Sequence, residues 1–349
     1  MAYPVDTAHH ILVIQPLVGI GDMIWHKPWI DALAARTTVT LAAKPTAQTA
    51  ILFPPEQHAG LHHLHIQRSL RGRKGRHDGI SGFFRLVADF RNSGADTAII
   101  LHHSPRYALA ARLAGIKVRL GYGHTSHNIG LNAGTVLDKA MLKDSHAIDR
   151  IARFSAENGF GLEQPHWHLA PKAQAIDWAT MWLAEHHLLA SDGRPLPYLI
   201  YGIGAMHEAR RWSAENFAAL AGLIAKSRLA MPILIIAAPN EEHIVNAIMA
   251  AAPKPSDLVP VICPLTEAVA LMSQAHGFVG NDSGLLNIMA CLNIPALGLF
   301  SQSKPLEYSP YLYKLELFAE QDYGSKGLID SITPEDVFAR MLEIWPDRS

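Results

Sequence analysis

Gly19-Ile20-Gly21-Asp22 is a glycine-rich turn with one carboxylate, and it follows the apolar run Ile11–Ile14. A carboxylate in such a turn can take a proton from a substrate hydroxyl as a general base, or it can cap the helix that starts there. The spacing does not separate these two interpretations. The turn is not the dinucleotide-binding pattern Gly-x-Gly-x-x-Gly, because Trp25 stands near the position of the third small residue.

Asn281-Asp282-Ser283-Gly284 is a second polar turn, between the apolar run Gly277–Gly280 and an apolar segment that begins at Leu285. The first N–H groups of a helix have no partner within the helix, and the helix dipole favours an anion at that end. We therefore expect an anion-binding site at this turn. A simple helix start is the alternative.

Arg210-Arg211-Trp212 follows the turn Gly202-Ile203-Gly204 and precedes Ser213, a typical N-cap residue. Two cations at this place could neutralise a bound phosphate. The alternative is a solvated arginine pair beside a tryptophan that packs in the core.

Residues 67–85 form a basic, glycine-rich stretch, which we expect to be a loop that leads into a helix starting at Phe83. Its cations are Arg68, Arg71, Arg73, Lys74, Arg76 and Arg85. Such a stretch suits an anionic acceptor or an anionic membrane surface, and a solvated run of charges is the alternative.

The twenty histidines do not indicate a metal site. None stands in the His-Glu-x-x-His pattern or at ligand spacing from a carboxylate on a helix, and the chain contains no Asp-x-Asp motif. The two cysteines, Cys263 and Cys291, have neither metal nor redox spacing. We therefore expect no metal and no disulfide framework.

The 349 residues are 49% hydrophobic and 17% charged, with a formal net charge of −1. This composition is typical of a folded chain and gives no chain-wide electrostatic basis for binding nucleic acid. The first ten residues are polar, and no window approaches the ~18 consecutive apolar residues of a membrane span. We therefore expect a cytoplasmic protein without a signal peptide.

Short apolar runs alternate with helical segments in both halves of the chain, and each half begins with a strand, a glycine turn and a helix. This order predicts an α/β protein of two doubly wound, Rossmann-like domains that face each other across a cleft, with ligands at the carboxyl ends of the strands. We place the domains at 1–170 and 171–330. A further helix is expected in 331–349, where it could pack back on the first domain.

In combination, these motifs resemble glycosyltransferase family 9, the heptosyltransferases. The resemblance rests on the Gly19–Asp22 turn, on the helix entry Ala209–Ser213 followed by Phe217, and on Leu265–Ala268 followed by Gly280–Gly284. These motifs occur in the family's order along most of the chain. The resemblance implies the GT-B fold, in which two Rossmann-like domains face each other.

By this resemblance, the protein is an inverting, metal-independent glycosyltransferase without a cofactor. Asp22 is then the base for an acceptor hydroxyl, which attacks the anomeric carbon of a nucleotide diphosphate sugar such as ADP-heptose. The first domain binds an anionic glycan or glycolipid acceptor such as the lipopolysaccharide core, with peripheral contact at the inner membrane surface, and the second domain binds the donor. The implied donor-binding residues are Gly204, Arg210, Arg211, Asp282, Ser283, Gly284, Leu285 and Asn287. The implied acceptor-binding residues are Gly21, Arg68, Arg71, Arg73, Lys74 and Arg76.

Two positions depart from the family's usual residues: Asn287 stands where a histidine is usual, and Ser213 stands where a proline is usual. Asparagine can donate a hydrogen bond to a phosphate but carries no charge. Two other functions therefore remain open, a GT-B nucleotide-sugar-binding protein with altered or no catalysis and a GT-B sugar-nucleotide epimerase.

Overall fold

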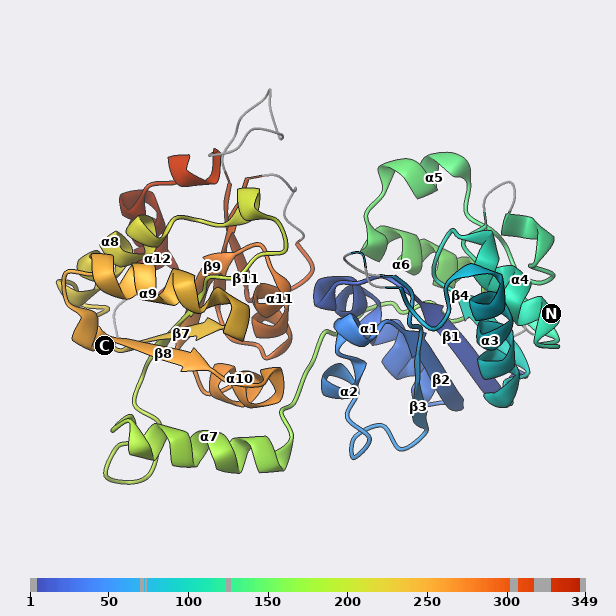
Figure 1. Cartoon of the computed structure of the whole chain (residues 1–349), viewed down its shortest axis with the longest axis horizontal. Helices are drawn as coiled ribbons and strands as arrows, with labels where there is room; N and C mark the ends of the chain where they lie inside the picture. The colour runs from blue at the N-terminus through green and yellow to red at the C-terminus, as the bar shows by residue number, and fades with distance from the viewer. Residues whose placement is uncertain are drawn as a thin grey trace. The chain divides into compact units, whose positions relative to one another are not determined.

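The computed structural model describes residues 5–69, 72, 74–123, 127–301, 307–316 and 328–345. The chain divides into two compact units, Met1–Trp167 and His168–Ser349, which are the first and second domains below. Each domain contains one parallel β-sheet with helices packed around it (Figure 1). The α/β class predicted from the alternation of apolar runs and helical segments is confirmed.

The first domain contains a five-stranded parallel sheet with the strand order β3-β2-β1-β4-β5. Ile11–Ile14 of the central strand are fully buried, as expected for a parallel strand covered on both faces. Because the order reverses direction at β1, the carboxyl end of β1 is a topological switch point, where ligands of such folds usually bind. The strands are β1 His10–Gln15, β2 Thr38–Ala43, β3 Leu61–His65, β4 Thr97–Ile100 and β5 Val118–Gly121.

The helices of the first domain pack in pairs, α1 against α6 and α3 against α4. The α1–α6 pair matters most for the site, because Asp22 lies in the first turn of α1. The helices are α1 Ile20–Ala34, α2 Thr49–Leu52, α3 Gly79–Asn92, α4 Pro105–Leu113, α5 Lys139–Asp144 and α6 Ala147–Glu157.

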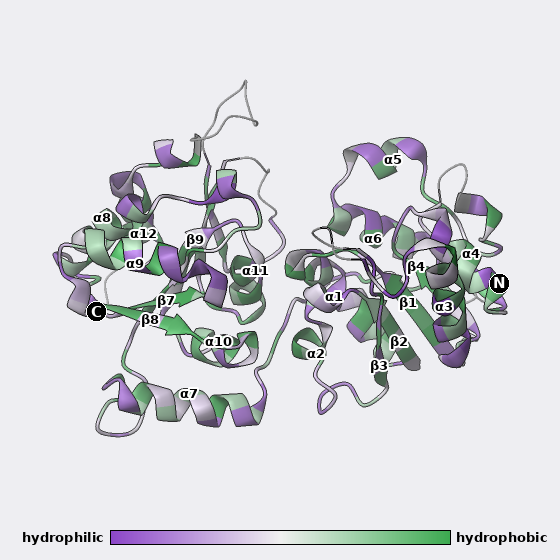
Figure 2. Ribbon diagram, in the orientation of Figure 1, coloured by the Kyte–Doolittle hydropathy of each residue, from purple (hydrophilic) through white to green (hydrophobic). Residues whose placement is uncertain are grey.

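The second domain contains a six-stranded parallel sheet with the order β11-β10-β9-β6-β7-β8. Figure 2 shows β7 and β8 as hydrophobic along most of their length. Gly202 of β6 pairs with Gly280 of β9, and a Cβ atom on Gly280 would lie 2.4 Å from the carbonyl oxygen of Gly202. Only glycine therefore fits at position 280. The strands are β6 Leu199–Gly202, β7 Ile233–Ala237, β8 Leu258–Ile262, β9 Gly277–Asn281, β10 Ala296–Phe300 and β11 Leu312–Glu316.

The last helix, α12, packs within the second domain against α8. Val337 and Met341 of this helix and Trp345 after it belong to the hydrophobic core of the second domain. Arg228 donates hydrogen bonds to the carbonyl oxygens of Leu342 and Trp345. The helices of this domain are α7 Ala173–Glu185, α8 Ala214–Ala225, α9 Glu242–Ala251, α10 Leu265–Met272, α11 Gly284–Cys291 and α12 Pro334–Ile344.

The structure differs from the sequence-based expectation in the basic stretch. α3 begins at Gly79, four residues before the predicted start at Phe83, so Ile80 also lies on the helix. The short helices α2 and α5 and the edge strands β3 and β11 were not predicted. In the described part of the chain, no helix combines the length and the apolar character needed to cross a bilayer.

Candidate functional site

Asp22 lies at the carboxyl end of β1, in the first turn of α1. Its Oδ2 accepts a hydrogen bond from the N–H of Gly19 at 3.1 Å, so the carboxylate does make the helix-start contact that was one of its two predicted roles. Burial raises the pKa of Asp22, and the Gly19 hydrogen bond and the charge of Arg150 lower it by less. Its carboxylate therefore binds a proton more readily than an ordinary aspartate does, which a general base needs.

Two buried side chains hold the backbone of Asp22. The carbonyl oxygen of Asp22 accepts hydrogen bonds from Nδ1 of His26 at 2.7 Å and from Nε2 of Gln15 at 3.2 Å. Burial lowers the pKa of His26 to about 4, so the ring is neutral at physiological pH. Since Nδ1 donates to the carbonyl, Nε2 must accept, and the hydroxyl of Tyr122 lies 3.0 Å from it. These contacts fix the turn that carries the carboxylate.

Arg150 supplies positive charge to the surroundings of Asp22 from helix α6. Its charge lowers the pKa of Asp22, and it also lowers the pKa of His146, which burial brings to about 4. The guanidinium donates a hydrogen bond to the carbonyl oxygen of Leu142 at 3.4 Å. Nothing in the sequence assigned Arg150 to a site, because 128 positions separate it from Asp22 and only the α1–α6 packing brings the two elements together.

In the second domain, Arg210 and Asp282 form an ion pair with 3.0 Å between Nη1 and Oδ2. The neighbouring Asn281 is fully buried, and its amide donates to the carbonyl oxygen of Ile203 at 2.7 Å and accepts from the N–H of Trp212 at 3.0 Å. Asn281 thus joins the loops after β6 and before α8 to the turn after β9. The structure brings the predicted Arg210 and the predicted Asp282 turn together.

The first turn of α11 is the predicted anion site. The side chain of Ser283 forms no capping hydrogen bond, and its buried Oγ has no partner among the described residues. Asn287 donates from Nδ2 to the carbonyl oxygen of Ser283 at 2.9 Å, and its Oδ1 accepts from the hydroxyl of Tyr308 at 2.7 Å. The amide of Asn287 is therefore engaged within the domain, and no motif in the sequence pointed to Tyr308.

Two further predicted donor residues, Arg211 and Gly204, lie close to other groups of the second domain. Arg211 donates to the carbonyl oxygen of Ala205 at 3.1 Å, and a Cβ atom on Gly204 would lie 2.6 Å from Oε1 of Glu241. Ser213 takes the predicted N-cap position of α8, but its side chain makes no capping hydrogen bond. Its N–H instead donates to Oδ1 of Asp330 at 2.8 Å.

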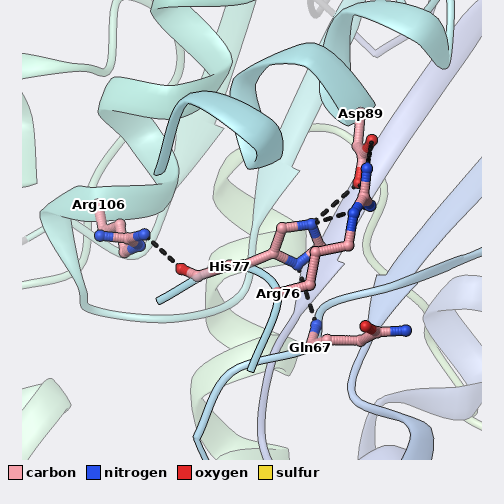
Figure 3. A network of polar contacts seen from close by, with 5 residues as sticks. All are labelled: Gln67, Arg76, His77, Asp89 and Arg106. Carbon is pink, nitrogen blue, oxygen red and sulfur yellow. Dashed lines mark hydrogen bonds and ion pairs between the residues drawn. The ribbon is translucent and has the colours of Figure 1, made fainter. Parts of the chain in front are cut away.

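The basic stretch of the first domain is held by a polar network around the buried His77 (Figure 3). Nδ1 of His77 accepts from the N–H of Gln67 at 3.0 Å, so Nε2 carries the proton, which it donates to Asp89 at 2.9 Å. Arg76 forms a two-bond ion pair with the same carboxylate. Arg106 donates to the carbonyl oxygen of His77 at 2.6 Å.

The predicted acceptor-binding residues of this stretch differ in whether their charge is paired with a carboxylate. Arg76 is paired with Asp89, Arg68 lies 3.4 Å from Asp78, and Lys74 is exposed. Arg71 and Arg73 lie outside the described residues. Two further cations lie close to Arg68: its charge lowers the pKa of both Lys44 and Arg106, after a larger effect of burial.

Groups of three or more His, Cys, Asp or Glu side chains that could hold a metal ion are not found in the described ranges.

Residues 83–328 match the model of glycosyltransferase family 9 (heptosyltransferase). The chain belongs to glycosyltransferase family 9. It is 25% identical over 272 residues, 76% of each chain, to lipopolysaccharide heptosyltransferase 2 of Escherichia coli (strain K12). The protein of Salmonella typhimurium with the same name matches over the same length with the same identity.

Solved structures of this family have the same fold. A family 9 glycosyl transferase from Veillonella parvula DSM 2008 is 21% identical, with a TM-score of 0.76 over 96% of this chain and 97% of that one. The E. coli ADP-heptose lps heptosyltransferase II is 22% identical, with a TM-score of 0.71 over 96% and 98%. The family and fold implied by the sequence motifs are thereby confirmed, and the residue roles within them stay predictions.

Proposed function

We propose that this family 9 glycosyltransferase transfers a heptose from ADP-heptose to a saccharide acceptor of the lipopolysaccharide core, with inversion at the anomeric carbon. The match to the heptosyltransferase family over residues 83–328 carries this proposal. The similarity to lipopolysaccharide heptosyltransferase 2, and to a solved heptosyltransferase named for ADP-heptose, supports the choice of donor and acceptor.

In this reaction, Asp22 is the general base. The acceptor hydroxyl gives its proton to the carboxylate of Asp22, its oxygen forms the bond to the anomeric carbon, and the bond from that carbon to the diphosphate breaks. ADP leaves with the bonding electron pair. The raised pKa and the turn held by Gly19, Gln15 and His26 support this role, because a base must have both proton affinity and a fixed position.

The second domain then binds the donor diphosphate. Arg210 supplies a cation that Asp282 already orients, and the N-terminus of α11 with the unpartnered Ser283 Oγ supplies hydrogen-bond donors. Gly284 and Leu285, in the first turn of α11, contribute backbone N–H groups. We infer that these groups stabilise the leaving diphosphate without a metal ion, since its charge increases as the bond breaks.

The acceptor is bound on the first domain through its anionic groups. Arg68 and Lys74 are the predicted contacts that the structure describes, and Lys44 and Arg106 lie close enough to Arg68 to add to them. Gly21 gives the acceptor hydroxyl close access to the turn that carries Asp22. An acceptor of the lipopolysaccharide core is built on a lipid, so we place the protein in the cytoplasm with peripheral contact at the inner membrane.

A nucleotide-sugar-binding protein with altered catalysis is the second candidate, and the contacts of Asn287 favour it. Asn287 stands where the family has a histidine. Its side-chain amide is hydrogen-bonded to the carbonyl oxygen of Ser283 and to the hydroxyl of Tyr308. An asparagine also carries no charge, so this position offers the donor no cation.

Two measurements on the purified protein separate these functions. A thermal-shift panel of ADP-heptose, ADP and UDP-sugars should show stabilisation by the adenine nucleotides, on the order of 2.7 kcal/mol at ~100 times the dissociation constant. Release of ADP from ADP-heptose should require a heptose-deficient core acceptor. Binding without ADP release would support the binding protein, and conversion of a UDP-sugar without any acceptor would support an epimerase. No shift with any nucleotide would exclude all three.

A further inference from the structure

The first two turns of α3 expose two large apolar side chains to water. Ile80 is 81% exposed and Phe84 is 59% exposed. Residues four positions apart are neighbours on a helix surface, so these two side chains lie side by side. The adjoining sector of α3 buries Leu86, Val87 and Phe90 in the domain. The helix is therefore fixed by one apolar face while a second apolar face has no protein to cover it in the described part of the domain.

Two cations lie close in the chain to this second face. Lys74 in the preceding loop and Arg85, next to Phe84, are exposed, and neither forms an ion pair with any described residue. The carboxylate of Asp89, on the same helix, is already paired with Arg76 and His77. The surroundings of Ile80 and Phe84 therefore carry excess positive charge.

The network around His77 makes this face a rigid unit. Asp89 of α3 binds His77 and Arg76 of the loop, and Arg106 of α4 donates to the carbonyl oxygens of His77 and Gly79 (Figure 3). The guanidinium of Arg106 also lies 5.0 Å from the ring centre of Phe83, which it covers. Ile80 and Phe84 are consequently held outward from the domain by the first turns of a helix anchored on both sides.

We propose that this face, formed by Lys74, Ile80, Phe84 and Arg85 and called the α3 face, docks on the anionic surface of a lipid bilayer. The two apolar side chains enter the boundary between headgroups and acyl chains, and the two cations bind lipid phosphates. A protein partner fits less well, because a specific protein interface buries about 1,200–2,000 Å² in total, far more than two side chains provide.

The position of the α3 face agrees with the proposed function, on which this part of the inference rests. α3 follows β3 as α1 follows β1, so its first turn and Asp22 lie at the same edge of one parallel sheet. An acceptor anchored in a bilayer by its lipid would present its sugar to the edge of the domain that docks there.

Vesicle flotation with the full chain tests the proposal. The wild-type protein should float with vesicles of phosphatidylglycerol and phosphatidylethanolamine in equal parts, and much less with phosphatidylcholine alone. The double variant Ile80→Ser/Phe84→Ser should lose more than about tenfold in partitioning, from the loss of two buried apolar side chains, and Arg85→Gln should lose about fivefold.

Met181→Ser is the matched control. Met181 is 65% exposed on α7, but its neighbours one turn away on either side are Asp177 and Glu185, so no positive charge accompanies it. This variant should float as the wild type does.

Three results would overturn the docking proposal: no flotation of the wild type, equal flotation on both lipid mixtures, or equal flotation of the wild type and the double variant. Loss of a dimer in the double variant, seen by sedimentation without vesicles, would make the face a contact between two copies instead. Transfer to a water-soluble, delipidated acceptor should be unchanged in the double variant, and its loss would move the face into the acceptor site. If the wild type docks but transfers to no acceptor, the proposed function fails and the docking surface stands.

Discussion

Asp22 of the first domain and Asp282 of the second domain both lie in a strand–turn–helix motif. Each follows a buried central strand and each stands at the start of the helix that follows. The partners of the two carboxylates differ. Asp22 accepts a hydrogen bond from the N–H of Gly19, whereas Asp282 forms an ion pair with Arg210 at 3.0 Å.

The two aspartates share a strand–turn–helix motif but differ in their contacts. We infer that these contacts determine whether the carboxylate can take up a proton or orient a cation. The ion pair uses one carboxylate oxygen of Asp282 to orient a cation. No described cation is in ion-pair contact with Asp22, so its half-buried carboxylate remains able to take up a proton. In the proposed function, such a motif therefore carries the base in the first domain and orients a phosphate-binding cation in the second.

Asp22→Asn is the strongest test of this contrast. An amide cannot accept the proton, so the rate of transfer should fall by ~10²-fold or more, while the affinity for ADP in the second domain stays the same. A turnover assay gives the rate of transfer, and isothermal titration calorimetry with ADP gives the affinity. A variant that still turns over at the wild-type rate would remove Asp22 from the mechanism.

Arg210→Gln should give the next largest effect. Losing a charged hydrogen-bond donor to the diphosphate should lower kcat/KM about 10- to 100-fold, with a matching loss in ADP affinity. Arg211→Gln is the control, because the guanidinium of Arg211 already binds the carbonyl oxygen of Ala205 and should matter less. Equal losses in the two variants would mean that the ion pair with Asp282 does not single out Arg210.

Tyr308→Phe, also in the second domain, should have a smaller effect. Without the hydroxyl, Asn287 loses the hydrogen bond that holds its amide against the first turn of α11. The dissociation constant for ADP should rise about three- to tenfold, the usual scale of one neutral hydrogen bond. Tyr313→Phe, a half-buried tyrosine on β11, serves as the control. Unchanged ADP affinity would show that the position of Asn287 does not influence the donor site.

Arg150→Met should change the pH dependence of the first domain with little effect on the maximal rate. The charge of Arg150 lowers the pKa of Asp22, so its removal raises that pKa further. The base is active as the carboxylate, and the acid limb of the kcat/KM profile should therefore move to higher pH. Arg153→Met, on the same helix but paired with Glu157, should leave the profile in place. A shift to lower pH would contradict the electrostatic assignment.

The sequence predicted the parts of the fold that are buried on both sides. Continuous apolar runs such as Ile11–Ile14 and Ile233–Ile236 identify central strands, because nothing in them faces water. The edge strands β3 and β11 contain His62 and Lys314 and are partly exposed, so they lack that pattern. A strand that is only half covered does not need the apolar run that identifies the others.

Of the candidate site, the sequence predicted the two turns but not the residues that contact them. Gly19–Asp22 and Asn281–Gly284 are local patterns, visible in a few consecutive residues. Their partners come from elements far away in the chain, as Arg150 does for Asp22 and Arg210 does for Asp282. Arg76 was expected to bind an acceptor, and its partner Asp89 lies 13 residues further along the chain, on α3.

The buried amide of Asn281 has a consequence for how a ligand would bind. It ties the loop at Ile203 and the loop at Trp212 to the end of β9. A site whose loops are already ordered loses little conformational entropy when it is filled, so binding there should be fast and require little rearrangement. In this half of the molecule, folding of the domain itself has already organised the loops.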